Sequence, residues 1–415
     1  MRKWLSEIGQ WWFGYASATT LGAYRLMACF LAFVSMAITL FQFNDFYTET
    51  GYVPAALALA WTTEDPRWSP LLGQFLFFET APVTSYGVTL AFYVVTMMFA
   101  VLAGIGYRTR VTMAIFALLY VGLQHRNVLI LHSGDSLLRI IMIFLAFSNC
   151  GAACSVDRLR RLWKGEEAPG SVPMVSNWTQ RLIQWQVAVL YFTAVWHKWG
   201  GIRWRDGTAT WYPTQIDELA RFPIPEAIER NLLFIQAATY GTLVVELALA
   251  TLVFARPFRK WVLLSGLLLH ASIEYQFTIP MFGWIMVSTY FCFYDGEEVS
   301  GWFHRLGQRL RRWAVTVRTP SGRELRGGPA AAIRATDALG LVTYEEGSAD
   351  SWQAERAGGG KGSYVWLSAS RSLGAWGFAW IPGLWRKLLN RALVDSQSET
   401  KASKKKGLKH AAKTS

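Results

Sequence analysis

Long apolar runs constrain the fold of this 415-residue chain more than any other feature. A helix needs about 20 apolar residues to cross the hydrocarbon core of a bilayer, and somewhat fewer where neighbouring helices shield it. The candidate spans are Leu21–Phe43, Tyr86–Ile105, Thr109–Leu123, Asp135–Cys150, Trp178–His197, Leu232–Ala255, Trp261–Ile273 and Pro280–Phe293. They predict an all-α polytopic membrane bundle of about eight transmembrane helices.

The composition agrees with a membrane protein that carries a smaller polar region. Hydrophobic residues make up 52% of the chain and charged residues only 17%, whereas about 25% of a typical soluble protein is charged. Some of the apolar runs contain a charged residue, namely Arg25, Arg139, Arg181 or Glu246. We expect these side chains to face the interior of the bundle or to reach the membrane surface, because a charge facing lipid is costly.

The net charge of +13 is explained by the arrangement of basic residues between the spans. Lys and Arg gather in every second connection, around residues 108–110, 158–164 and 256–260, and in the last twenty residues. This alternation follows the positive-inside rule, so nucleic-acid binding is not indicated. We expect an inner-membrane protein with both termini in the cytoplasm. The outer helix ends and outer loops then carry His125, His132, His197, Lys198 and His270.

The sequence divides into five predicted segments. They are an N-terminal cytoplasmic segment (1–20), the transmembrane domain (21–295), a basic amphipathic helix on the membrane surface (296–313), a small soluble α/β region (314–395) and a Lys-rich disordered tail (396–415). Residues Val315–Leu325 alternate in polarity and turn at Pro320-Ser321-Gly322, which predicts a hairpin. The soluble region is expected to be cytoplasmic.

Lys198 is the most informative single residue, because it lies at the end of an apolar run between Trp196 and Trp199. It can be read as an interface anchor whose amine reaches the headgroups. It can also be read as a catalytic amine, because burial disfavours the ammonium and a neutral amine can act as a base.

His132 and His270 are weaker candidates when each is considered alone. His270 follows three leucines, and a histidine on such a helix can be purely structural. His132 precedes Ser133 and Asp135, either of which could cap the helix that begins there. No His-x-x-x-His or His-Glu-x-x-His spacing occurs, so no metal site is predicted.

Taken together, these segments resemble a known family. The run Tyr191-Phe192-x-Ala194-x-x-x-Lys198, and the run from His270 to Met281-Phe282, are similar to segments of the vitamin K-dependent gamma-carboxylases. The order Gly106-Tyr107-Arg108, His132-Ser133, Ser155-Val156-Asp157 also matches. The resemblance extends to the bacterial relatives of these enzymes, the horizontally transferred transmembrane (HTTM) domain proteins, and covers about residues 20–300.

The resemblance implies a membrane enzyme that couples hydroquinone epoxidation to proton abstraction and carboxylation of a glutamate-type substrate. Lys198 would be the base, and His132 and His270 would hydrogen-bond the quinone or the substrate. Tyr191, Trp199, Met281 and Phe282 would contact the cofactor. Reduced vitamin K or another hydroquinone, O2 and CO2 are implied, with no metal.

The implied partners are membrane lipid and an extracytoplasmic peptide or protein substrate, but not nucleic acid. His197 stands where the animal carboxylases have a second lysine, and their large extracytoplasmic C-terminal portion has no counterpart here. An alternative is therefore a quinone- or lipid-binding HTTM protein without carboxylase activity.

Overall fold

The computed structural model describes residues 2–54, 57, 86–127, 129–222, 224–337, 339–346, 352–356 and 390–395. The chain forms two compact units. The first comprises Met1–Cys154 and Met174–Asp295, and the second comprises Ser155–Pro173 and Gly296–Ser415. The predicted tail of residues 396–415 lies outside the described residues, as do residues 357–389 of the predicted soluble region.

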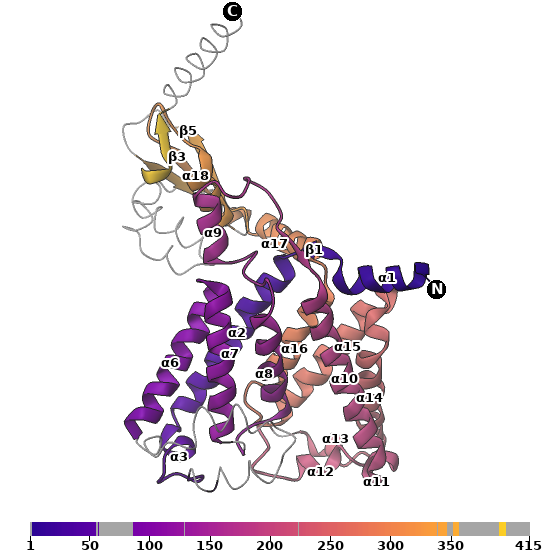
Figure 1. The fold of residues 1–415 in the computed structure, drawn as a ribbon. Helices are drawn as coiled ribbons and strands as arrows, with labels where there is room; N and C mark the ends of the chain where they lie inside the picture. Colours follow the sequence, from indigo (N-terminus) through magenta and orange to yellow (C-terminus); the bar gives the residue numbers. More distant parts are fainter. Residues whose placement is uncertain are drawn as a thin grey trace, which may run out of the picture. The chain divides into compact units, whose positions relative to one another are not determined.

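The first unit is a helical bundle (Figure 1). Its long helices are α2 (Thr19–Leu40), α6 (Tyr86–Ile105), α7 (Thr109–Arg126), α8 (Ser133–Ala146), α10 (Trp178–Gly200), α14 (Leu232–Ala250) and α15 (Arg256–Gln276). They run side by side with the short helix α16 (Phe282–Thr289), which continues into the 3-10 turn η4 (Tyr290–Phe293). Helix α1 (Arg2–Phe13) lies across one end of the bundle.

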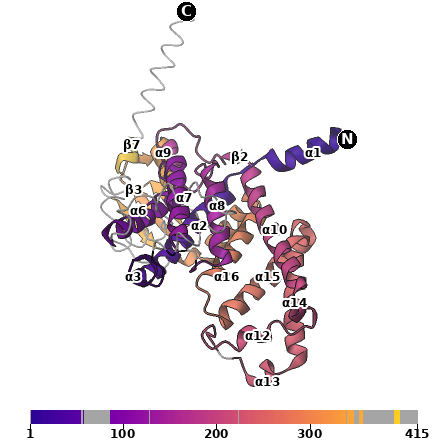
Figure 2. The ribbon, with the colours of Figure 1, turned by 60° about the horizontal axis from the view of Figure 1, so that its bottom comes forward.

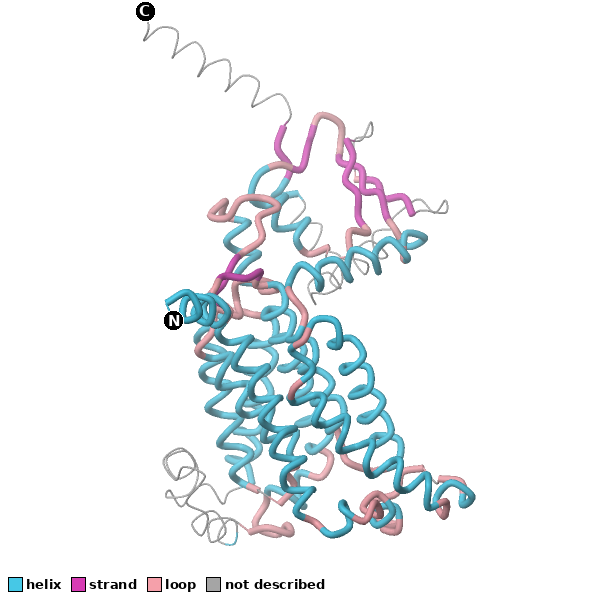
Figure 3. The backbone as a smooth tube through the Cα atoms, turned by 90° about the vertical axis from the view of Figure 1, so that its right-hand side faces the viewer, coloured by secondary structure: helices cyan, strands magenta, loops and turns pink. Residues whose placement is uncertain are grey.

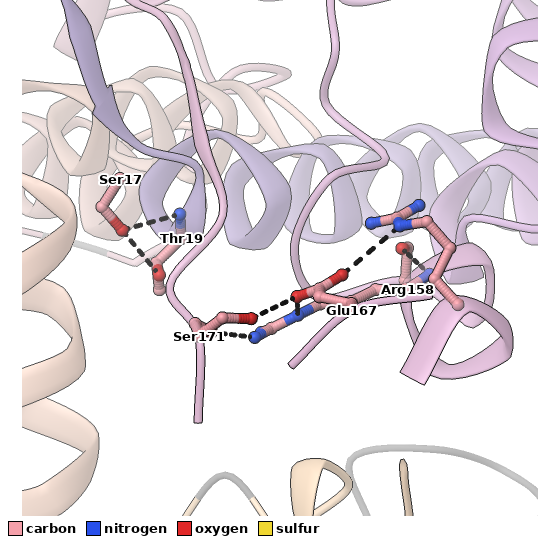
Figure 4. Close-up of polar contacts among 7 residues, drawn as sticks. Ser17, Thr19, Arg158, Glu167 and Ser171 are labelled. Atoms are coloured by element: carbon pink, nitrogen blue, oxygen red, sulfur yellow. Dashed lines mark hydrogen bonds and ion pairs between the residues drawn. The ribbon is translucent and has the colours of Figure 1, made fainter. Parts of the chain in front are cut away.

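Short elements close both ends of this bundle. At the end opposite α1, Figure 1 shows α3 (Phe43–Tyr47), α11 (Ile202–Arg205), α12 (Trp211–Thr214) and α13 (Glu226–Glu229). The 3-10 turn η3 (Leu252–Phe254) connects α14 to α15. Two short strands, β1 (Tyr15–Ser17) and β2 (Met174–Ser176), pair antiparallel. Where β1 meets α2, the Ser17 hydroxyl accepts a hydrogen bond from the Thr19 backbone N–H at 3.3 Å (Figure 4).

All of the predicted spans contain helix, although several bounds shift by a few residues. Within the described residues, three helices are long and apolar enough to cross a membrane, namely α2, α6 and α14. The helical architecture is therefore confirmed, and the count of eight transmembrane helices stays a prediction. The sharpest shortening is at the last predicted span, Pro280–Phe293, where the α-helix covers only Phe282–Thr289.

Three of the four charged residues noted within the apolar runs are buried in the bundle, whereas Arg181 is half-buried and donates to the Trp11 carbonyl at 3.2 Å. Arg25 has no exposed surface, and Arg139 and Glu246 are each 7% exposed. The Arg25 guanidinium donates to the carbonyl oxygens of Gly104 and Cys150, the latter at 2.6 Å, and to that of Cys154. This satisfies the expectation that such groups face inward, because backbone carbonyls replace the water that the cation loses.

The long helices of the bundle fall into two groups. In Figure 2, α10, α14 and α15 lie on one side, and α2, α6 and α7 on the other. Helix α16 contacts α2, α8 and α15, and so connects the two regions. Residues from both regions belong to one apolar core, in which Tyr24, Phe116 and Ile141 are fully buried.

The second unit is a small α/β arrangement, shown with its strands in magenta in Figure 3. Its elements are α9 (Val156–Trp163), α17 (Gly296–Arg309), η5 (Arg311–Trp313), β3 (Val315–Thr319), β4 (Arg323–Leu325), α18 (Gly327–Ala335), β5 (Val342–Glu346), β6 (Gln353–Arg356) and β7 (Leu393–Asp395). The order β5-β3-β6 makes one sheet, with β5 parallel and β6 antiparallel to β3, and β4 pairs with β7.

The predicted hairpin over Val315–Leu325 is wrong. Strand β3 is the central strand of its sheet, so both of its edges are already occupied by β5 and β6. The chain does turn at Pro320–Gly322, where the Thr319 hydroxyl donates to the Arg323 carbonyl at 2.6 Å. Strand β4 then joins the separate sheet with β7 instead of folding back on β3.

The segment Ser155–Pro173 belongs to the second unit, which the sequence did not indicate. Helix α9 packs against α18, and Gly328 lies so close to the Leu162 and Trp163 carbonyls that a side chain there would collide with them. Glu167 fixes the rest of the segment by accepting from Arg158 Nε at 3.0 Å and from the Ser171 hydroxyl at 3.1 Å (Figure 4).

Candidate functional site

A cavity of about 560 Å³ lies among α10, α14, α15 and the chain that follows α10. Its wall is mostly apolar, with a few hydroxyl groups and charged side chains. The lining residues are Lys198, Trp204, Ala209, Thr210, Trp211, Pro213, Thr214, Ile224, Glu229, Phe234, Ile235, Ala237, Ala238, Gly241, Thr242, Val245, Glu246, Ser265, Leu268, Leu269, Ser272, Ile273, Gln276 and Phe277. Its size and apolar wall suit a small organic ligand.

The chain that follows α10 is held against α14 by hydrogen bonds. Tyr240 donates to the Arg205 carbonyl at 2.9 Å, and the Thr210 and Thr239 hydroxyls lie 2.9 Å apart. The turn at Gly207 has φ of +79°, a conformation that favours glycine. Within it, the Thr208 hydroxyl holds the pKa of Asp206 below its ordinary value by donating a hydrogen bond to the carboxylate. These contacts position Trp204 and Trp211 as one wall of the cavity.

One ion pair lies in the wall of this cavity. Lys198 Nζ, from α10, donates to Glu246 Oε1, from α14. The same ammonium faces the Trp204 ring, 5.2 Å from its centroid, in a cation–π contact. Glu246 is 7% exposed, and its second oxygen, Oε2, is buried without a hydrogen-bond partner among the described residues. The pair therefore has one unused acceptor.

His270 belongs to a buried network of hydroxyl groups. Tyr191 Oη lies 2.7 Å from His270 Nε2 and 2.8 Å from Tyr290 Oη. Gly266 makes room for this network, because a Cβ at that position would lie 2.5 Å from Tyr290 Oη. His270 is 3% exposed, and its Nδ1 has no hydrogen-bond partner in the part of the chain that is described.

His132 is the N-cap of α8, a role that the sequence assigned to Ser133 or Asp135. The His132 Nδ1 accepts a hydrogen bond from the Gly134 backbone N–H at 3.1 Å, and the His132 backbone N–H donates to Asp135 Oδ2 at 3.2 Å. Its Nε2 lies 2.8 Å from the Pro280 carbonyl oxygen. The histidine thus fixes the start of α8 against the chain that leads into α16.

Phe282 connects the two histidines. Its ring centroid is 5.7 Å from that of His132 and 5.4 Å from that of His270, with interplanar angles of 82° and 67°. Met281, which precedes it, has φ of +61°, a strained conformation for a residue with a side chain. The strain is located where the chain turns into α16 and places Phe282 between His132 and His270.

The comparison with known families gives one match. The family model of the HTTM domain matches residues 24–297. The chain belongs to the HTTM domain family. Together with the three apolar helices, this identifies a membrane protein. No curated protein and no solved structure matches the chain.

The HTTM domain therefore contains every residue that the sequence singled out, but the structure does not bring them to one cavity. Lys198 lies in the large cavity. His132, with Asp135 and Pro280, lines a second cavity of about 290 Å³. Lys198, His132 and His270 do not line a common cavity, and their catalytic roles stay predictions.

The predicted cofactor-contacting residues have different surroundings. Tyr191 is buried in the His270 network. Met281 and Phe282 pack against the core, and Trp199 is 58% exposed. None of these four lines the Lys198 cavity or the His132 cavity.

Sequence reasoning missed two residues of the HTTM domain that the structure brings to the site. Glu246 was noticed only as a charge within an apolar run, and Tyr290 was not noticed. The inward-facing charge of Glu246 was the one available signal, since an intramembrane carboxylate usually has a cationic partner. Among the described residues, no group of three or more His, Cys, Asp or Glu side chains could hold a metal ion.

Proposed function

We propose that this HTTM protein is a multi-pass enzyme of the inner cell membrane that couples hydroquinone epoxidation to carboxylation of a glutamate-type substrate. The observation that supports the proposal is the Lys198 cavity. Its volume is about 560 Å³, and its wall is largely apolar except for one ion pair. An aromatic ligand with a polar edge needs this combination. The resemblance of the Lys198 segment to the carboxylases supplies the reaction class.

The residues present fit a hydroquinone. Trp204, Trp211 and Leu269 offer apolar contacts, and Lys198 offers a charged group to a hydroxyl of the ligand. When bound, reduced vitamin K or another hydroquinone would supply, with O2, the strong base that removes a carbon-bound proton, and CO2 would then add to the carbanion. The chain's own contribution is to bind the ligand, exclude water and move the hydroxyl proton at the Lys198–Glu246 pair.

His132 and His270 act as positioning residues in this proposal. Both pack on Phe282, and His270 is hydrogen-bonded to Tyr191 on the same helix as Lys198. Helix α10 thus presents Lys198 to the cavity and is fixed to α15 through Tyr191. A rigid support of this kind holds a reacting group in a productive geometry.

The orientation of the protein follows from its charge pattern. We propose that both termini and the second unit are cytoplasmic, because basic residues alternate along the chain as the positive-inside rule requires. Lys198 then faces the extracytoplasmic side, where an extracytoplasmic peptide or protein substrate would reach it. Membrane lipid is the surrounding partner.

Isotope-labelled CO2 tests the reaction. Purified protein in lipid vesicles receives vitamin K hydroquinone, O2, labelled CO2 and a glutamate-containing peptide. We expect acid-stable label in the peptide together with epoxide from the hydroquinone. Epoxide without label would restrict the activity to the quinone half-reaction, and the absence of both products would contradict the proposal.

A second function is favoured by one observation. Lys198 is ion-paired with Glu246, and His270 is enclosed by tyrosine hydroxyls, so neither is a free base in this structure. This arrangement suits a quinone- or lipid-binding HTTM protein without carboxylase activity. Saturable binding of vitamin K hydroquinone with no epoxide formed would select this alternative.

A further inference from the structure

Helix α1 presents an apolar face to the surroundings of the bundle. Trp4, Ile8 and Trp11 follow one another at spacings of four and three residues, so they share one face of the helix, and all three side chains are exposed. Figure 1 shows that α1 lies across the end of the bundle. When the long helices cross a membrane, a helix in this position lies along the membrane surface. Its apolar face then suits the boundary between headgroups and acyl chains.

Helix α1 is fixed against the first turns of α10. The Arg181 guanidinium donates to the Trp11 carbonyl at 3.2 Å, and its Cζ lies 4.5 Å from the centroid of the Trp11 ring. The rings of Trp12 and Trp185 stack with their centroids 6.4 Å apart. These contacts hold α1 at the level of Arg181 on α10.

An exposed apolar stripe continues from Arg181 along the same face of α10. Its members follow Arg181 at helical spacings of four, four, three and four residues, and they are Trp185, Val189, Phe192 and Trp196. From Arg181 to Phe192 the helix rises about 16 Å, which is close to half of a hydrocarbon core of about 30 Å. This face therefore offers a cation at the depth of the headgroups and an apolar surface as deep as one leaflet.

Two more arginines lie near Arg181, at the start of α15. Arg256 and Arg259 are near enough to repel the Arg181 guanidinium, and Asp295 attracts it. Asp295 also pairs with Arg256 at 3.4 Å, and the Arg256 side chain is 80% exposed. The four groups together carry an excess of positive charge. Arginine suits phosphate well, because its planar guanidinium offers two parallel donors.

We propose that the junction of α1, α10 and α15 binds an anionic phospholipid of the adjoining leaflet. The arginines hold its phosphate, the α10 stripe contacts its acyl chains, and the apolar face of α1 lies in the same leaflet. A free phosphate ion would use the arginines but not the stripe, and for this reason a lipid fits the junction better. The site is separate from the Lys198 cavity, because Lys198 is at the other end of α10, and it does not depend on the proposed reaction.

Native mass spectrometry of the intact protein, released from a neutral detergent, tests this site. The wild type is titrated with dioleoyl phosphatidylglycerol, which is anionic, with dioleoyl phosphatidylcholine, which has no net charge, and with glycerol phosphate, which has no acyl chains. We expect phosphatidylglycerol to bind about tenfold or more tightly than phosphatidylcholine, and glycerol phosphate not to be retained. Equal affinity for the two lipids would overturn the inference. Glycerol phosphate that binds as tightly as phosphatidylglycerol would also overturn it, since the site would then take a free anion.

A double variant, Arg256→Gln with Arg259→Gln, removes two of the cations and leaves Arg181 with its contacts to α1. We expect its affinity for phosphatidylglycerol to fall about tenfold or more, to near that for phosphatidylcholine. The matched control is Arg203→Gln with Arg230→Gln, which removes two exposed arginines at the opposite end of the bundle and should keep the wild-type preference.

Two outcomes of the variant experiment would overturn the site. They are an unchanged preference in the first double variant, and an equal loss in the control, which would mean that net charge alone sets the preference. The wild-type comparison needs no variant, so it tests the site even if the double variant does not fold.

Discussion

The Arg25 guanidinium on α2 and the Lys198 ammonium on α10 are both cations within a largely apolar bundle, but they are neutralised differently. Arg25 is fully buried, donates to three backbone carbonyl groups and lines neither the Lys198 cavity nor the His132 cavity. Lys198 has one carboxylate partner, Glu246, and both residues line a large cavity. A buried charge with all of its contacts made by backbone indicates a structural role, whereas a partly satisfied pair beside a cavity indicates a ligand.

Replacing Arg25 should have the largest effect on stability. Arg25→Leu leaves the carbonyls of Gly104, Cys150 and Cys154 without their donor, so we expect a loss of about 3–5 kcal/mol in the free energy of unfolding. Thermal unfolding in detergent micelles measures this. Arg203→Leu is the control, because its ion pair with Asp206 is exposed and water screens it. Equal melting of the two variants would contradict a structural role for Arg25.

Replacing Lys198 should have the largest effect on activity. Lys198→Ala removes the amine of the pair at which the hydroxyl proton is proposed to move, and we expect epoxide formation to fall by about 100-fold or more. The rate is measured in lipid vesicles with vitamin K hydroquinone. Lys260→Ala removes an exposed lysine that lies over Trp261 and should change nothing. An unchanged rate in Lys198→Ala would mean that Lys198, like Arg25, has a structural role, and would contradict the comparison.

The tyrosines around His270 should have smaller and unequal effects. Tyr191→Phe removes hydrogen bonds to both His270 and Tyr290 and should cost about 1–3 kcal/mol, because it strands a buried ring nitrogen. Tyr290→Phe removes one hydroxyl contact and should cost about 1 kcal/mol. Unfolding in detergent ranks the two variants. A larger loss of stability in Tyr290→Phe would mean that the Tyr290 hydroxyl, and not that of Tyr191, contributes most to the stability of the network.

The sequence was informative about individual residues and poor about their partners. Lys198, His132 and His270 could be singled out because an ionisable group in an apolar run is unusual. Their contacts could not be predicted, because periodicity does not say which helices become neighbours. Glu246 meets Lys198 across 48 residues, and Tyr290 meets Tyr191 across 99.

Local patterns failed where tertiary contacts decided the outcome. The turn at Pro320–Gly322 was read correctly, but β3 has neighbours on both edges from more distant parts of the chain. His132 took the capping role expected of Ser133 or Asp135, because its ring also lies near Phe282 and the Pro280 carbonyl, which are far along the chain. Capping propensities alone do not contain these contacts.

Ligand binding in a variant with a filled cavity tests the central claim most directly. Gly241 lines the Lys198 cavity, and a Cβ there would meet no atom within 4 Å, so Gly241→Trp places an indole ring in the cavity without displacing a neighbour at Cβ. Leu267→Trp, on the exposed side of α15, is the matched control. Retention of radiolabelled vitamin K hydroquinone is measured under anaerobic conditions. We predict that Gly241→Trp loses binding and Leu267→Trp keeps it, and equal binding by the two variants would contradict the assignment of this cavity as the ligand site.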